Sequence, residues 1–176
     1  MTNWNELRDR AYKTACEHGF HDEEMSDEHY LCLVISELME AVQADRKGKR
    51  ADMEAYEKYN GRIDFIENFE RQIKDTVEDE LSDVCIRIFD LAGLRGINLN
   101  SAIKYTYFIN KSKFTEIVYD IVADITNDAY TIGDRLYSAL SKVFALADFL
   151  DIYLLCHIKM KMKYNETREY KNGRKY

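Results

Sequence analysis

The sequence contains no proline, although a chain of 176 residues with average usage would hold roughly nine. Proline disrupts helix interiors, so its absence favours long helices over a structure rich in turns. Glycine is also scarce, with seven residues, and several of them stand where helical patterns stop. Apolar residues recur at the i, i+3, i+4, i+7 spacing along most of the chain, and strict alternation is rare. The sequence therefore predicts an all-α helical bundle.

Cysteine pairs and long apolar runs are missing as well. The four cysteines are far apart and form no CxxC pair, so we expect reduced, buried thiols. The longest apolar stretch, 143–158, is too short to span a bilayer and contains Asp148 and Asp151. The segment MTNWNELRDR at 1–10 lacks the apolar core of a secretory signal. These absences predict a cytoplasmic protein with no membrane contact.

Basic residues are also fewer than acidic ones, so the formal net charge is −7. An acidic chain argues against a surface that binds nucleic acid. Apolar residues make up 46% of the chain, and 13 tyrosines and 8 phenylalanines are among its residues. We expect part of this apolar surface to be buried between two copies, in a homodimer.

The helical pattern predicts one domain, 1–176, with five to seven helices. Ser26, followed by Asp27 and Glu28, is typical of a helix start, and Gly19 and Gly96 follow helix ends. The expected helices are at about 3–18, 27–46, 62–72, 75–95, 113–129 and 133–163, with a shorter one at 51–58. The polar, basic segment 164–176 is expected to form a tail.

The chain also carries a weak internal repeat. Residues 89–110 align without gaps to 144–165. Leucine-rich helices align easily, so the match is either a coincidence of pattern or the trace of an internal duplication. The same register pairs Glu80 with Arg135 and Asp83 with Ser138. If the duplication is real, only the first copy holds acids at these positions and the second half is degenerate.

Two acidic pairs stand inside apolar helical stretches. Glu37 and Glu40 lie in LCLVISELMEAV, and Glu80 and Asp83 lie in VEDELSDVCIRIFDLAG. A spacing of three residues places both members of a pair on one side of a helix, one turn apart. On a helical wheel each pair falls within or beside the apolar face. We therefore expect both pairs to point inwards, where carboxylates require a cation.

That cation is either a basic side chain or a metal ion. A single acid in such a place is usually solvated or paired with a nearby base, such as Arg87 for Glu80. If the two helices pack together, however, four carboxylates meet and repel one another, and a divalent cation removes the conflict. The sequence lacks the Cys/His cluster of a zinc site and the Glu-x-x-His motif of a di-iron bundle. Mg²⁺ is the metal that we expect, with Mn²⁺ as the alternative.

Together with a basic segment further on, these motifs resemble the all-α nucleoside triphosphate pyrophosphatases, the MazG-like proteins and the dimeric dUTPases. The family pattern is Glu-x-x-Glu on one helix, Glu-x-x-Asp on the next, and then Lys-x-x-x-Asn-x-x-Arg. In this chain ISELMEA, DELSDVCIRIFDLAG and KMKYNETREYKNGRKY match the pattern through Glu37, Glu40, Glu80, Asp83, Lys161, Asn165 and Arg168. The resemblance covers most of 1–95 and 144–176.

The resemblance implies a Mg²⁺-dependent hydrolase that splits a nucleoside triphosphate into the monophosphate and pyrophosphate. The four acids would hold the metal and carry the catalysis, with Glu40 as a candidate to accept the proton of the attacking water. Lys161, Asn165 and Arg168 would bind the phosphates. A Phe-His pair at 20–21 resembles the base pocket of the small MazG-like branch, so His21 or His29 would contact the base.

The chain departs from the compact MazG-like layout at 98–155, an inserted or duplicated helical segment. This longer layout resembles the dimeric dUTPases, in which one half of the chain has no metal-binding acids. The substrate therefore stays open between deoxynucleoside triphosphates in general and dUTP alone. A further alternative is a non-catalytic helical protein that keeps the scaffold to bind nucleotides or partners.

Overall fold

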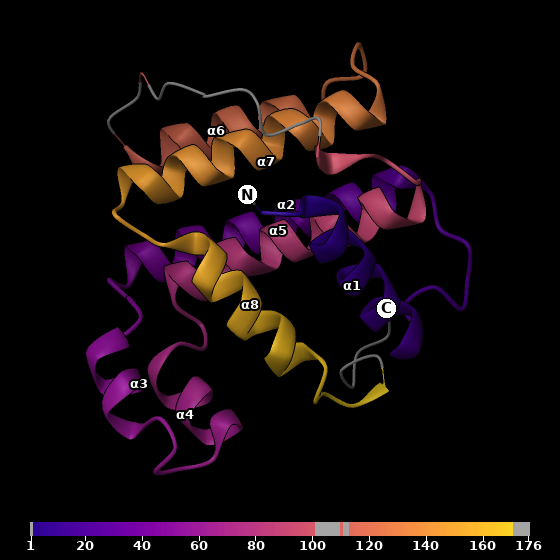
Figure 1. Cartoon of the computed structure of the whole chain (residues 1–176). Helices are drawn as coiled ribbons and strands as arrows, with labels where there is room; N and C mark the ends of the chain where they lie inside the picture. Colours follow the sequence, from indigo (N-terminus) through magenta and orange to yellow (C-terminus); the bar gives the residue numbers. More distant parts are fainter. Residues whose placement is uncertain (1, 101–109, 111–112, 171–176) are drawn as a thin grey trace.

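The computed structural model describes residues 2–100, 110 and 113–170 (Figure 1). These residues form eight α-helices and no strand, which confirms the predicted all-α class with one helix more than expected. The helices are α1 (Trp4–Glu17), α2 (Asp27–Arg46), α3 (Met53–Tyr59), α4 (Phe65–Gln72), α5 (Val77–Leu94), α6 (Phe114–Ile125), α7 (Ile132–Phe149) and α8 (Leu154–Asn165). No described helix combines the length and the apolar composition needed to cross a membrane.

Helix α5 lies at the centre of the molecule. It contacts α1, α2, α7 and α8, and thirteen of its 18 residues are buried. Figure 1 shows α2 and α5 crossing the middle, with α6 and α7 on one side and α1 and α8 on the other. A helix covered on several sides must bury whatever polar residues it carries, so α5 is where buried acids need partners.

A small second core fixes the far end of α8. Phe69 and Ile73, from α4 and the residue after it, are buried against Tyr164 of α8. The rings of Phe69 and Tyr164 are stacked, with centroids 4.6 Å apart. The Tyr164 hydroxyl also donates a hydrogen bond to Glu70 at 2.7 Å. The α3–α4 pair therefore holds the basic end of α8 against the rest of the bundle.

The predicted helix ends at glycine are confirmed. At Gly19, with φ +77°, the amide of Phe20 donates to the carbonyl of Ala15 at 3.0 Å. At Gly96, with φ +66°, the amide of Ile97 donates to the carbonyl of Ala92 at 2.8 Å. Both are Schellman ends, which require a left-handed residue that glycine adopts without strain. The predicted cap at Ser26 is also confirmed, because its side chain accepts from the amide of His29.

The prediction of one helix over 133–163 is wrong, because the chain turns between α7 and α8. Asp151 has φ +58°, and the amide of Ile152 donates to the carbonyl of Ala147 at 2.8 Å. This is the same Schellman end as at Gly96, formed here by an aspartate that periodicity alone does not mark as a helix end. The turn buries Ile152 and Leu154 in the core. The extra helix comes from this break.

The two regions that the repeat pairs have matching helix starts and helix ends at α5 and α7. Thr76 caps the start of α5 and Thr131 caps the start of α7, each accepting from the amide three residues later. The helices end in the same Schellman geometry, at Gly96 and Asp151. The rest of the alignment, at 101–109, lies outside the described residues, as does the tail segment 171–176.

Candidate functional site

A cleft of about 140 Å³ lies between α1, α2, α5 and α8. The residues that the family pattern predicts for metal and phosphate binding all line it: Glu37, Glu40, Glu80, Asp83, Lys161, Asn165 and Arg168. The lining also includes an apolar set, with Ala11, Ala15, Phe20 and Ile86 among it. Residues from both ends of the chain and from its centre therefore share one cavity.

Three of the four predicted acids meet at one point of the cleft. Glu37 and Glu40 of α2 and Glu80 of α5 each offer a carboxylate oxygen, and these oxygens lie within 4.8 Å of one another. Glu37 and Glu80 are buried, while Glu40 is exposed. The spacing of three along α2 and the packing of α2 on α5 produce this arrangement, as the sequence predicts.

Burial makes the charged form of these acids costly. It raises the pKa of Glu80 to about 8, and the carboxylates of Asp83 and Asp79 add to the effect. Burial also raises the pKa of Glu37 to about 6, helped by Asp83 and opposed by the guanidinium of Arg87. Oxygen ligands held close together in this way, with too little positive charge beside them, suit a hard divalent cation.

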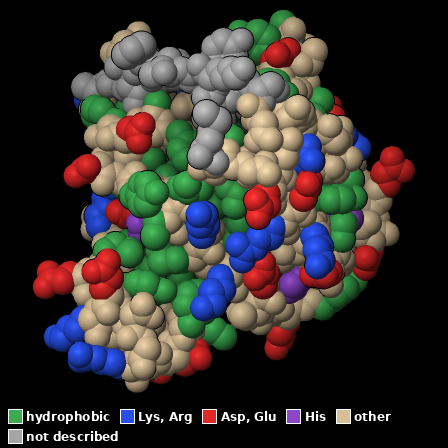
Figure 2. All heavy atoms as spheres, in the orientation of Figure 1, with side chains coloured by type: hydrophobic (Ala, Val, Ile, Leu, Met, Phe, Trp, Pro, Cys, Tyr) green, Lys and Arg blue, Asp and Glu red, His purple; other side chains and the backbone are tan. Residues whose placement is uncertain are grey.

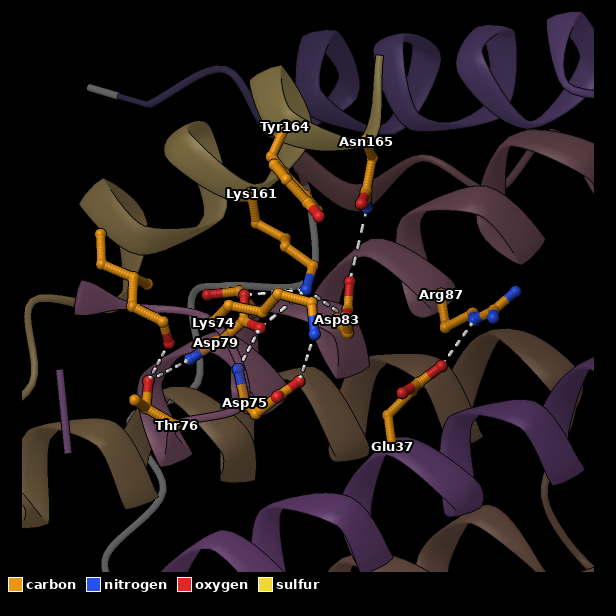
Figure 3. Close-up of polar contacts among 12 residues, drawn as sticks. Glu37, Lys74, Asp75, Thr76, Asp79, Asp83, Arg87, Lys161, Tyr164 and Asn165 are labelled. Atoms are coloured by element: carbon orange, nitrogen blue, oxygen red, sulfur yellow. Dashed lines mark hydrogen bonds and ion pairs between the residues drawn. The ribbon is translucent and has the colours of Figure 1, made fainter. Parts of the chain in front are cut away.

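Arg87 is the base that pairs with an acid of this group, but its partner is Glu37 rather than Glu80. Its Nε donates to Glu37 Oε1 at 3.1 Å (Figure 3). The guanidinium also lies over the ring of Phe20, with 5.8 Å to the centroid. Within the described residues, Glu40 and Glu80 form no ion pair. A local base therefore compensates one of the three acids and leaves the other two.

The fourth predicted acid, Asp83, has a different set of partners. Its Oδ2 lies 2.8 Å from Lys161 Nζ, and its Oδ1 accepts from Asn165 Nδ2 at 3.4 Å (Figure 3). Lys161 also contacts Asp79, which the sequence analysis did not single out. Burial by itself would lower the pKa of Lys161, but the two aspartates hold that pKa above its ordinary value. The ammonium group is therefore charged at neutral pH.

Asn165 and Arg168 lie on the α8 side of the cleft. The Oδ1 atom of Asn165 is buried and has no hydrogen-bond partner among the described residues. The guanidinium of Arg168 lies over the ring of Tyr164, 6.0 Å from its centroid, and forms no ion pair with any described residue. Its backbone carbonyl is hydrogen-bonded to His18 Nε2 at 2.9 Å. A buried acceptor without a hydrogen-bond donor and a guanidinium without a carboxylate partner both favour the binding of a ligand here.

The two histidines predicted to contact a base do not line this cleft. His21 is held between Asp90 Oδ1, at 2.7 Å, and the Tyr30 hydroxyl, at 3.1 Å. His29 lies in the first turn of α2, with its ring edge-on to Tyr30. A base contact by either histidine stays a prediction. His18 and Phe20, their neighbours in sequence, line the cleft instead.

Acidic and basic side chains intermingle over α1 and α8 on the face shown in Figure 2. One such pair, Arg10 of α1 with Glu166 just after α8, is 2.6 Å apart and joins the two helices. This pair and the hydrogen bond from His18 connect the start of the chain to the segment that carries Arg168. The relative position of the two cleft walls is thus fixed by contacts between opposite ends of the described chain.

Sequence reasoning missed Asp79, Lys74 and Asp75, which also line the cleft. Asp79 is 1% exposed, and it directly precedes Glu80 in the first turn of α5. The run of acids in VEDELSD could have indicated Asp79, but the argument from residue spacing used only Glu80 and Asp83 from this run. Its burial follows from α8 covering the start of α5, which helical periodicity does not predict.

No protein-family model matches this chain, and neither the curated proteins nor the solved structures that were searched contain a match.

Proposed function

We propose that this protein is a Mg²⁺-dependent nucleoside triphosphate pyrophosphohydrolase, which releases a nucleoside monophosphate and pyrophosphate. The observation that carries the proposal is the meeting of Glu37, Glu40 and Glu80 at one point of a cleft that also contains Asn165 and Arg168. Carboxylates that can hold a divalent cation and bases that can receive phosphates are thus placed in one cavity, as polyphosphate chemistry requires.

The residues present fit a magnesium ion. Glu37, Glu40 and Glu80 supply hard oxygen donors, and Glu80 is costly to ionise unless a cation is beside it. The unpartnered Oδ1 of Asn165 is a further buried acceptor in the same cleft. When bound, the metal would neutralise phosphate oxygens and make a water molecule more acidic. Glu40, the exposed member of the group, is placed to accept a proton from solvent-accessible water.

The phosphates would be received by the α8 side of the cleft. Arg168 offers a planar guanidinium with several donors, which suits phosphate oxygens. The apolar part of the lining, with Phe20, Ala11 and Ala15, offers a surface on which a base can pack. A nucleotide with its base towards α1 and its phosphates towards the acids would use both kinds of surface.

The layout of the chain in two halves bears on the substrate. The matching caps and ends of α5 and α7 support an internal duplication, with the acids at the positions of Glu80 and Asp83 kept in the first half alone. That layout is typical of the dimeric dUTPases, so a preference for dUTP is the alternative within this function. A non-catalytic nucleotide-binding protein is the alternative outside it.

Pyrophosphate release over a panel of nucleoside and deoxynucleoside triphosphates, with and without Mg²⁺, tests the proposal. We expect Mg²⁺-dependent release of pyrophosphate rather than of single phosphates. Release from dUTP alone would identify the dUTPase alternative. If no nucleotide is cleaved but one of them raises the melting temperature, the protein is a binding protein and the proposed activity is wrong.

A further inference from the structure

The ammonium group of Lys161 is surrounded by carboxylates (Figure 3). Its Nζ lies 2.8 Å from Asp79 Oδ1, 2.9 Å from Asp79 Oδ2 and 2.8 Å from Asp83 Oδ2. Lys161 is 4% exposed and Asp79 is 1% exposed, so water does not compete for these contacts. The ammonium donates a hydrogen bond to Asp79 Oδ2, and Asp79 Oδ1 and Asp83 Oδ2 lie at ion-pair distance from it. Two carboxylates therefore neutralise this single positive charge.

The acids of the cleft form two overlapping groups, which share Glu80. Asp75, Asp79 and Glu80 bring carboxylate oxygens within 4.8 Å of one another, as Glu37, Glu40 and Glu80 do. In the first of these groups, Lys161 compensates Asp79, and Lys74 Nζ lies 2.8 Å from Asp75 Oδ1. In the second, a single guanidinium compensates Glu37. Both groups therefore bring carboxylate oxygens close together, but their charge balances differ.

A divalent cation beside Asp79 and Asp83 would have to lie next to a buried ammonium. At such distances two positive charges repel strongly in a buried place, and both would compete for the same carboxylate oxygens. The group of Glu37, Glu40 and Glu80 is less hindered. The guanidinium of Arg87 touches it at one oxygen of Glu37 only, and Lys161 acts on Glu80 through its charge without an ion pair among the described residues.

We infer that Lys161 occupies the place of a second divalent cation, so that this protein binds one metal ion, through Glu37, Glu40 and Glu80. The inference rests on the proposed function, because it assumes that the acidic group binds a metal. It also changes the role of Lys161 from the predicted phosphate ligand to a built-in counter-ion for Asp79 and Asp83. The phosphate-binding role passes to Arg168.

The number of metal ions bound by the unmodified protein tests this directly. We would titrate the metal-free protein with Mn²⁺ alone and follow bound metal by electron paramagnetic resonance and by calorimetry. One ion per chain is expected. Two ions per chain would overturn the inference and leave the proposed function standing, whereas no bound ion would overturn the metal assignment itself.

Two substitutions then test the part played by Lys161. Lys161→Met removes the ammonium, and we expect the Mn²⁺ stoichiometry to rise from one to two. Lys163→Met, an exposed position on the same helix, is the matched control and should stay at one. Asp79→Asn is expected to keep one ion and to change its affinity by less than tenfold, because Asp79 is an ion-pair partner of Lys161 rather than a metal ligand.

Two results would overturn the role proposed for Lys161. A stoichiometry of one in folded Lys161→Met protein, checked by circular dichroism, would overturn the role of the ammonium. A tenfold loss of Mn²⁺ affinity in Asp79→Asn would show that Asp79 is a metal ligand and would also overturn it. If Lys161→Met does not fold, the count in the unmodified protein and the Asp79→Asn affinity decide between these outcomes.

Discussion

The α2–α5 pair and the α6–α7 pair are built alike, but their charges are balanced differently. Both α5 and α7 start at a threonine cap and end at a left-handed residue. Arg87 of α5 pairs with Glu37 of α2, and Lys142, at the aligned position of α7, pairs with Asp124 of α6 at 2.6 Å. A cation on one helix, half-buried at Arg87 and buried at Lys142, and an acid on its neighbour are thus common to both pairs.

The pairs differ in how much negative charge is left over. Ser138 and Arg135 stand in α7 where α5 has Asp83 and Glu80. The Ser138 hydroxyl donates to Asp124, and Arg135 pairs with Asp128 at 3.1 Å. In the α6–α7 pair, Asp124 is therefore compensated by Lys142 and Ser138 together. The α2–α5 pair keeps an excess of acids, and under the proposed function that excess is where a metal ion would bind.

The largest effect is expected on activity. Glu80→Gln and Glu37→Gln should each lower pyrophosphate release by at least about 100-fold, since a lost metal contact removes several kcal/mol of transition-state stabilisation. Asp124→Asn, in the other pair, should keep the normal rate. Initial rates at saturating Mg²⁺ measure this, with circular dichroism to confirm folding. Normal activity in both glutamate variants would remove the distinction between the pairs.

Variants of the two cations, Lys142 and Arg87, should respond differently to metal. Lys142→Met leaves Asp124 without its ion pair and should lower the free energy of unfolding by about 1–3 kcal/mol. Arg87→Met should cost a similar amount without metal, because Glu37 loses its base. Millimolar Mg²⁺ should bring Arg87→Met back to the stability of the unmodified protein at the same Mg²⁺ concentration, whereas Lys142→Met should stay below it by the same amount as without metal. Urea unfolding with and without Mg²⁺ measures both, and equal rescue would contradict the comparison.

Magnesium should stabilise the unmodified protein more at pH 8 than at pH 6. A ligand that binds only the folded state adds about 2.7 kcal/mol at 100 times its dissociation constant. Glu37 and Glu80, with pKa values of about 6 and 8, must lose protons to bind it, so affinity rises with pH. Melting temperatures at the two pH values measure the effect. An equal shift at both would argue against these ligands.

Without metal, stability should fall as the pH rises from about 5 to 8. The pKa of Glu80 is raised to about 8 in the folded state, so the folded protein binds more protons than the unfolded chain over this range. Raising the pH therefore favours the unfolded state. Glu80→Gln should flatten the dependence, and Asp124→Asn should leave it unchanged. Chemical unfolding across this range, with a chelator present, is the measurement.

The smallest effect concerns the two matched helix ends. Asp151 has the left-handed backbone that Gly96 has at the end of α5. This conformation costs an aspartate more free energy than it costs a glycine. Asp151→Gly should raise stability by up to about 1 kcal/mol, and Gly96→Asp should lower it by a similar amount. Thermal unfolding compares them. Opposite signs would show that the two ends are not equivalent.

Much of the cleft could be predicted from local patterns. The spacing of Glu37 with Glu40, inside apolar stretches, is enough to place both on the side of α2 that meets α5. Such patterns work because a helix repeats every 3.6 residues and buries its apolar face. The glycine ends at 19 and 96 follow from the same local chemistry.

The partners of each charge could not be predicted in this way. Sequence spacing favoured Glu80 as the partner of Arg87, and the family resemblance implied a phosphate contact for Lys161. In the structure Arg87 pairs with Glu37, and Lys161 pairs with Asp79 and Asp83. Which base meets which acid depends on how α8 lies across α5, and that depends on the turn at Asp151 and on the Phe69–Tyr164 contact. These are long-range packing choices, for which no local pattern exists.

The order of residues along the chain was thus sufficient for the helical class, for most helix limits and for the presence of buried acids, because each depends on neighbours within a few turns. The pairing of cations with acids was settled by the packing of distant helices. Burial strengthens every unbalanced charge, so the final assignment of partners decides which acids stay available for a metal ion.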